Sequence, residues 1–343
     1  MKCFKLIFLL SFIVFVLLVN VATVSMQVIN IGHGLTTEHP WHKGCQFIKE
    51  QLEGRSNGEL KVNIYDSYSL SQGSWSILLE QLEKNIVQMA PQSTIPYATQ
   101  VEELFAFNTP FLFDDMDHVM RFMAQKPPVV DKWFSKLENK GLKVVGIWPR
   151  PCRQLINSKR PIRTPEDIKG LRFRVPELNL FVKTFEAMGA KPVPLASGEI
   201  YTAIQLGTVV GEDNSAGTIF DAKSYEVTKY MSKWNYMADL ILVTVNKEWF
   251  ESLPEKYQTL INEVTQEAAE VVYKESVKQE EYAMKVFEEK GIEFTYFTDE
   301  MKKSFKDLMT PIYDYLKSTI GEDDWKEFLS FVEKARVKGP YGF

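Results

Sequence analysis

Cysteine, histidine and the common catalytic motifs are scarce in this 343-residue sequence, which has three cysteines and four histidines. It contains no Cys-x-x-Cys pair and no Gly-x-x-x-x-Gly-Lys-Ser/Thr loop, so a thioredoxin-like redox site and a P-loop nucleotide site are excluded. Basic residues form no block, and 45 acidic side chains outnumber 40 lysines and arginines. Because nucleic acids select basic surfaces, nucleic acid is not expected as the main partner.

Long apolar runs are absent after residue 26, and the one at the amino terminus has the form of a secretory signal peptide. Lys2 and Lys5 precede an apolar run at 6–19, and small residues follow it. We therefore expect residues 1–26 to be cleaved and the remaining chain to be exported. A membrane anchor is the alternative, because the run approaches spanning length if residues 21–24 are added.

Cys45 and Cys152 stay in the chain once residues 1–26 are removed, whereas Cys3 leaves with them. Two cysteines in an exported chain allow one disulfide but not a disulfide framework. The hydrophobic core, drawn from a chain that is 45% hydrophobic, must therefore hold the fold.

Two successive stretches of alternating strand and helix patterns predict an α/β fold with two lobes. Residues 27–150 are assigned mainly to lobe 1 and residues 151–240 mainly to lobe 2. The expected strands lie at 28–32, 60–65, 86–90, 142–148, 153–157, 171–175, 191–195, 209–212 and 240–245, and the expected helical segments at 40–53, 75–84, 102–137, 178–188 and 199–206.

The segment 254–290 has almost no helix-breaking residue and predicts one long helix. About 37 residues at ~1.5 Å each would extend roughly 55 Å, longer than one lobe, so we expect this helix to bridge both lobes. Two helices broken near Glu275 are the alternative. Residues 241–343 should thus supply a return strand, the bridging helix, and C-terminal helices at 299–318 and 323–337 that contact both lobes.

Three histidines, His33, His39 and His42, lie close together in the sequence and are the candidates for a metal site. Tetrahedral zinc needs three or four protein ligands, so a metal receptor would require all three to converge. Solvated or cleft-lining histidines are the simpler interpretation. No metal and no cofactor are therefore expected, and His33 is kept as a cleft residue.

Arg174 differs from the other arginines of this region because it lies near the end of a predicted strand, 171–175, just before Pro176. Ligands of α/β proteins bind at the carboxyl ends of strands, and a guanidinium group there suits a carboxylate. Arg172 shares the strand face in ideal alternation but sits further back, where a surface ion pair is the usual role. The strand therefore predicts a carboxylate site at Arg174.

Short motifs recur in a recognisable order through the second half of the chain. They are CRQ at 152–154, NSKRPI at 157–162, IKGLRFRVP at 168–176, MGAKPVP at 188–194, EIYTAIQ at 199–205, VGEDN at 210–214, YEV at 225–227, KY at 229–230 and VNKEWF at 245–250. Together they resemble the periplasmic receptors of tripartite ATP-independent periplasmic (TRAP) transporters, of the DctP type. The likeness covers essentially the whole chain after residue 26, and the motifs are specific as a set.

The resemblance implies that Arg174 is the principal carboxylate anchor, with Arg153 and Asn214 as further polar contacts. It implies a two-lobe periplasmic binding protein fold with a long helix bridging both lobes, and lobes that close around the ligand. The closed form would then dock on the membrane permease subunits of a TRAP transporter. Such a receptor is not an enzyme, and we expect a monomer in the periplasm.

The chain departs from the sialic-acid receptors that it resembles in general form. A Ser-Gly pair at 197–198 stands where they carry an aromatic residue, and Gln92 stands where they carry a Glu. Sialic acid is therefore disfavoured. Gln92 and Asp213 would suit hydroxyl groups, while Trp75 and Trp234 would cover an apolar face, which favours a sugar acid such as a uronate, or a C4-dicarboxylate-type organic acid.

Three other functions stay open at this point. A periplasmic enzyme acting on a sugar acid would need a nucleophile or an acid–base pair in the cleft. A metal receptor would need converging histidines, and a sensor domain without a transport role would need a transmembrane signalling segment.

Overall fold

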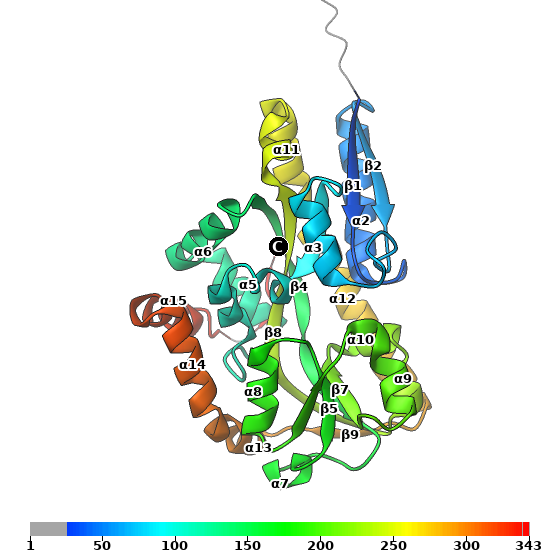
Figure 1. Cartoon of the computed structure of the whole chain (residues 1–343), viewed down its shortest axis with the longest axis vertical. Coiled ribbons are helices and arrows are strands. Elements are labelled where there is room, and N and C mark those ends of the chain that lie inside the picture. Colours follow the sequence, from blue (N-terminus) through cyan, green and yellow to red (C-terminus); the bar gives the residue numbers. More distant parts are fainter. Residues whose placement is uncertain (1–25, 338, 343) are drawn as a thin grey trace, which may run out of the picture.

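The computed structural model describes residues 26–337 and 339–342. A nine-stranded sheet runs through it in the order β2-β1-β3-β8-β4-β7-β5-β6, with β9 beside β8. Two strands, β4 (Leu142–Asn157) and β8 (Tyr230–Asn246), are long enough to take part in both halves of the sheet. Figure 1 shows the other elements grouped around the two ends of these strands, which divides the molecule into two lobes.

Lobe 1 is built on β1 (Gln27–Gly32), β2 (Leu60–Tyr65) and β3 (Met89–Ser93). β1 pairs in parallel with β2 and β3, and β3 pairs antiparallel with residues 241–245 of β8. The earlier half of β4 completes this sheet by pairing antiparallel with the later half of β8, the half that also pairs with β3.

Helix α2 (Pro40–Arg55) covers the lobe 1 sheet as its sequence pattern predicts. Cys45, Ile48 and Leu52 recur at helical spacing and are fully buried. Pro40 is accommodated in the first turn, where its missing N–H leaves no hydrogen bond unmade.

Lobe 2 is built on β5 (Arg172–Val175), β6 (Lys191–Pro194) and β7 (Gly211–Asn214), joined by the later half of β4. β5 lies parallel between β6 and β7, so the carboxyl ends of these three strands meet at one edge. β9 (Glu293–Tyr296) adds to the far side of β8.

Short helices cover the sheet and fill the side of the molecule where α5, α6, α14 and α15 gather in Figure 1. The helices are α3 (Trp75–Glu83), α4 (Thr94–Tyr97), α5 (Met116–Ala124), α6 (Pro128–Glu138), α7 (Pro165–Ile168), α8 (Asn179–Ala187), α9 (Ile200–Gln205), α10 (Ala216–Asp221), α11 (Lys247–Ser252), α13 (Asp299–Lys306), α14 (Thr310–Ile320) and α15 (Glu322–Lys334), with 3-10 turns η1 (Glu102–Asn108), η2 (Ser197–Glu199), η3 (Ser224–Val227) and η4 (Asp307–Met309).

Helix α12 (Glu255–Glu289) is one continuous helix of 35 residues. Ile261 in its first half packs into the core of lobe 1 beside α2, whereas Ala283 and Phe287 in its last turns pack against α10 in lobe 2. The prediction of a single helix that bridges both lobes is confirmed, and the alternative break near Glu275 is wrong.

Several expected boundaries are wrong. The two strands predicted on either side of Pro149 and Pro151 are one strand, because bulges in β4 accommodate the prolines. β8 begins at Tyr230 rather than at 240, β9 has no predicted counterpart, and the helix predicted at 299–318 is divided by η4.

The structure does not test the signal peptide predicted at the amino terminus, whereas it does describe the two cysteines. The signal peptide predicted for residues 1–26 lies, apart from Met26, outside the described residues. Within the described residues, no helix has the length and apolarity to cross a membrane.

Cys45 and Cys152 are buried free thiols in different hydrophobic clusters, and burial raises the pKa of both.

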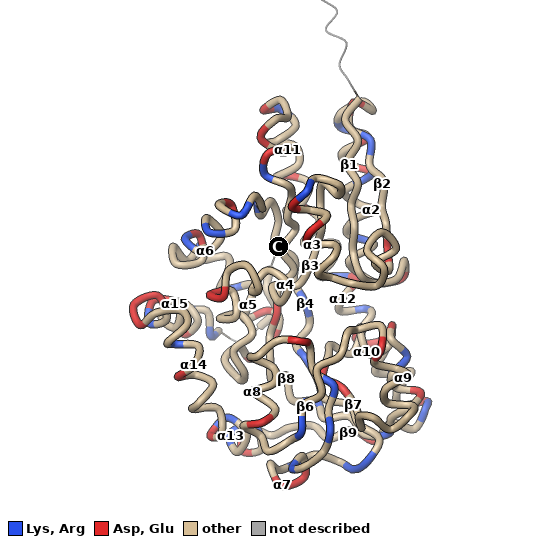
Figure 2. Tube along the Cα trace, in the orientation of Figure 1, with Lys and Arg blue, Asp and Glu red and all other residues tan. Residues whose placement is uncertain are grey.

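Charged residues of both signs alternate along the helices and loops of the part of the chain that Figure 2 colours. The formal net charge of the sequence is −5. Exposed charges of both signs are solvated and screened by salt, so the charged groups that can define a site are the few that are buried.

Candidate functional site

A cavity of about 320 Å³ lies between the lobes, where β4 and β8 pass from one to the other. This volume is within the ~300–1,000 Å³ of small-molecule sites. Five predicted site residues line it: Trp75, Gln92, Arg153, Arg174 and Asn214.

Arg150 and Arg153 both reach the cavity because β4 has a bulge between them. Residues three apart in a regular strand face opposite sides. Here Arg150 pairs with Asp239 and Arg153 with Met237, so β4 holds one extra residue at this point. The bulge turns both guanidinium groups to the same side.

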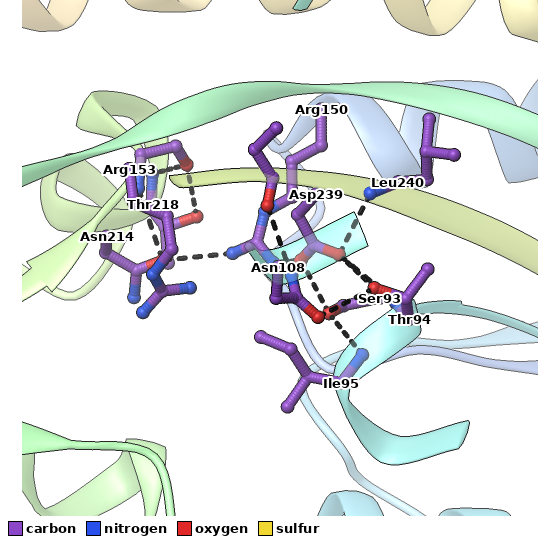
Figure 3. Close-up of polar contacts among 12 residues, drawn as sticks. Ser93, Thr94, Ile95, Asn108, Arg150, Arg153, Asn214, Thr218, Asp239 and Leu240 are labelled. Atoms are coloured by element: carbon purple, nitrogen blue, oxygen red, sulfur yellow. Dashed lines mark hydrogen bonds and ion pairs between the residues drawn. The ribbon is translucent and has the colours of Figure 1, made fainter. Parts of the chain in front are cut away.

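The Arg150 guanidinium is fixed by two acceptors (Figure 3). Its Nη1 donates to Asp239 Oδ2 at 2.6 Å, and its Nη2 donates to Asn214 Oδ1 at 2.9 Å. Asp239 is fully buried and also accepts from the hydroxyls of Ser93 and Thr94, each at 2.6 Å. Burial lowers the pKa of Arg150, while Asp239 opposes that effect. This group ties lobe 1 to both long strands.

Arg153 is held by Asp213 on the neighbouring β7. Its Nε donates to the Asp213 carboxylate and its Nη2 to the Asp213 carbonyl oxygen at 2.6 Å. The Tyr236 hydroxyl donates to the same carboxylate. Although burial alone would lower the pKa of Arg153, Asp213 raises it. Asp213 does not line the cavity, contrary to expectation, because its charge is used to hold Arg153.

Arg174 is buried at the carboxyl end of β5 without a comparable partner. Its Nε donates to the Leu195 carbonyl oxygen at 2.9 Å, and its Nη2 lies 3.5 Å from Ser197 Oγ. Across residues 26–337, no carboxylate oxygen lies within ion-pair distance (4.0 Å) of this guanidinium. Burial lowers the pKa of Arg174, while Glu212 and Asp213, which form no ion pair with it, oppose that effect. Arg172, by contrast, is exposed and donates to the Gly207 carbonyl oxygen at 2.7 Å.

The lobe 1 wall of the cavity carries Gln92 among aromatic side chains. Gln92 is 2% exposed, and its Oε1 and Nε2 atoms have no hydrogen-bond partner within the described structure. Trp41, Tyr68 and Trp75 line the same wall. A buried amide without partners is costly, so this one is available to a ligand.

His33 lies behind the cavity wall rather than in it. Its Nε2 is 3.0 Å from His42 Nδ1, and burial lowers the pKa of His33 to about 3, so the ring is neutral. His39 accepts from the Trp41 N–H at the start of α2. Within the described residues, no three His, Cys, Asp or Glu side chains are arranged to hold a metal.

Trp234 lies in the core instead of at the cleft. Between Ser232 and Met237, β8 has additional residues that have no partner on β4. This irregularity carries Trp234 into an aromatic cluster with Phe111 and Phe305, where it is fully buried. Strand alternation cannot reveal such a displacement.

Arg150 is a site residue that the sequence interpretation missed, as it missed Trp41 and Tyr68 on the lobe 1 wall. Arg150 lies between two prolines, which is itself a sign of a strand irregularity that could re-aim a side chain. To choose Arg150 rather than a neighbouring arginine from the sequence, one would have to know that it pairs with Asp239, which is 89 residues away.

The pentapeptide at 54–58, GRSNG, matches the Gly-x-Ser-x-Gly pattern of hydrolase nucleophiles. In those enzymes the serine lies on a turn from a strand to a helix. Ser56 instead lies on the turn from α2 to β2, and its hydroxyl accepts from the Leu60 N–H at 3.0 Å. Ser56 is therefore a structural residue of the turn.

A cavity between two lobes that are joined by two strands, with a buried guanidinium that forms no ion pair within the described residues, is typical of a solute-binding protein. Comparisons with known proteins agree. Residues 31–319 match the model of the bacterial extracellular solute-binding protein family 7, DctP. The chain belongs to this family of periplasmic solute receptors of TRAP transporters, and it is therefore a binding protein rather than an enzyme.

Relatives with assigned ligands are similar over most of their length. The 2,3-diketo-L-gulonate-binding periplasmic protein YiaO of Escherichia coli is 26% identical over 84% of this chain and 87% of its own. The C4-dicarboxylate-binding periplasmic protein DctP of Vibrio cholerae is 28% identical over 86% and 88%. The sugar acid binding protein DctPAm of Advenella mimigardefordensis, solved with galactonate, is 27% identical over 90% and 98%, with a TM-score of 0.84.

Proposed function

We propose that the mature chain is the periplasmic receptor of a TRAP transporter and that it binds a small carboxylate in the cavity between its lobes. The observation that carries this proposal is Arg174, a buried guanidinium without a carboxylate partner at the edge where the parallel strands of lobe 2 end. The assigned relatives bind sugar acids and C4-dicarboxylates. Both kinds of ligand carry the group that Arg174 suits.

Each polar residue has a role in this proposal. Arg174 binds the carboxylate, Asn214 and Arg153 complete the lobe 2 wall, and Gln92 binds the end of the ligand that faces lobe 1. A charge-assisted hydrogen bond contributes about 1.5–3 kcal/mol net, whereas micromolar affinity requires about 8 kcal/mol. Contacts in lobe 1, including the aromatic face of Trp75, must supply the remainder, which requires the lobes to close.

The cellular context follows from the family and from the amino terminus. Residues 1–26 are proposed to be a cleaved signal peptide, and the receptor is proposed to work as a monomer that delivers its ligand to membrane permease subunits. Residues 27–150 and 151–240 are proposed as the main parts of lobes 1 and 2, and 241–343 as the part that contacts both.

The test is a ligand screen followed by one matched pair of variants. Thermal-shift measurements with uronates, aldonates, C4-dicarboxylates and 2-oxo acids should reveal at least one carboxylate that stabilises the protein. Titration calorimetry should then show that Arg174→Ala loses about 30-fold or more in affinity, since it removes the partner of a desolvated carboxylate.

Arg172→Ala is the control, because Arg172 lies on the same strand but is exposed and bonded to Gly207. It should change affinity by less than about fivefold. Equal losses in the two variants, or a screen in which no carboxylate binds, would contradict the proposed function.

A further inference from the structure

The buried charges beside the cavity leave one cation for the ligand. Arg150 is paired with Asp239 and Arg153 with Asp213, and all four side chains are buried. Arg174 is the buried arginine that lacks a carboxylate partner among residues 26–337. The lobe 2 wall can therefore neutralise one negative charge of a ligand without breaking an existing ion pair.

Glu212 does not enable the lobe 2 wall to neutralise a second negative charge on the ligand. It pairs in register with Arg174 on the adjacent strand, but it does not line the cavity. Its carboxylate accepts from the Ser224 hydroxyl and from Asn214 Nδ2 at 3.3 Å. Any negative charge on Glu212 reduces the positive potential at Arg174.

The lobe 1 wall of the cavity contains aromatic, hydroxyl, amide and aliphatic groups, and Arg150, whose guanidinium lies over the Trp41 ring, is already paired with Asp239. Its polar centre is Gln92, of which both side-chain heteroatoms are buried without a partner. An amide presents one acceptor and two donors. A hydroxyl group, which both donates and accepts, can satisfy both ends of this amide.

A second carboxylate would fit poorly at Gln92. It could accept from Nε2, but it would face the Oε1 lone pairs, and the Arg150 guanidinium beside Trp41 is already paired with Asp239 and so is no free counter-ion. A desolvated carboxylate without a counter-charge is strongly unfavourable.

We infer, on the basis of the proposed function, that the ligand is a hydroxylated monocarboxylate whose carboxylate meets Arg174 and whose hydroxyl end meets Gln92. Gln92 is then the residue that selects against dicarboxylates.

The experiment uses pairs of acids that differ at one carbon: galactonate with galactarate, and gluconate with glucarate. In each pair the terminal CH₂OH of the first acid is a carboxylate in the second. Titration calorimetry on the full mature protein should show at least one monocarboxylate binding about tenfold or more tightly than its dicarboxylate counterpart. Succinate is included as a dicarboxylate without hydroxyl groups.

Three variants separate the role of Gln92 from a general loss of structure. Gln92→Leu should weaken the monocarboxylate by about tenfold, since it removes the hydrogen bonds but keeps the volume. Gln92→Lys should reverse the preference within a pair, because it adds a cation to lobe 1. Gln100→Leu, a glutamine of the same lobe outside the cavity, should change neither affinity, and melting temperatures without ligand confirm that each variant is folded.

The outcomes distinguish this inference from the proposed function. Tighter binding of galactarate, glucarate or succinate than of every monocarboxylate would overturn the inference while leaving a carboxylate receptor in place. Equal losses of affinity for the two acids of a pair in Gln92→Leu would also overturn the inference. Binding of no acid at all would instead overturn the proposed function.

Discussion

Asp239 is a residue at which a small change should strongly destabilise the protein. Asp239→Asn keeps the shape of the side chain and one acceptor oxygen but removes a fully buried charge. The Arg150 guanidinium, 7% exposed and 2.6 Å from the carboxylate, would then be a buried cation without a counter-ion. Breaking one side of a buried ion pair costs about 3–5 kcal/mol, so the melting temperature should fall by about 4–8 °C.

Urea unfolding followed by far-UV circular dichroism measures this loss, and a double-mutant cycle identifies its cause. Arg150→Met combined with Asp239→Asn removes both charges of this pair, so the double variant should regain most of the stability that Asp239→Asn loses. Glu267→Gln is the control, because its ion pair with Arg55 is exposed and should contribute less than about 1 kcal/mol. A loss below about 1 kcal/mol in Asp239→Asn, or no recovery in the double variant, would refute the reasoning.

Two further predictions concern the link between the lobes and the response to acid. The Thr36 hydroxyl donates to Asp221 across the mouth of the cavity at 2.9 Å, so Asp221→Ala should increase the radius of gyration without ligand in small-angle scattering; unchanged scattering curves would contradict this. Burial lowers the pKa of His33 from 6.5 to about 3, so the unfolded chain binds its proton more readily and stability should fall as pH drops from about 6.5 towards 3. His33→Gln should make the free energy of unfolding less dependent on pH in that window, and an unchanged slope would count against a neutral buried ring.

Local sequence patterns predict much of this fold because most elements are short and their apolar residues follow helix or strand spacing. Helix α12 was predictable because nothing within it breaks a helix, and Arg174 because it ends a strand. The bulges in β4 and β8 were not predictable, since they depend on how two strands whose paired residues are 73 to 104 positions apart come into register. Those bulges place Arg150 in the cavity and remove Trp234 from it, so these two errors in the predicted site come from long-range pairing.

The two long strands and α12 also determine when this chain can fold. Lobe 1 needs residues 241–246 of β8 to pair with β3 and β4, and it needs α12 to cover α2, although both arrive long after β3 has been synthesised. Contacts between residues so distant in sequence make folding slow. Neither lobe can be completed by an amino-terminal fragment, so truncation should yield aggregating chains rather than a smaller receptor. If the chain is exported unfolded, as its proposed signal peptide implies, the same delay would keep it unfolded until its last third has been synthesised.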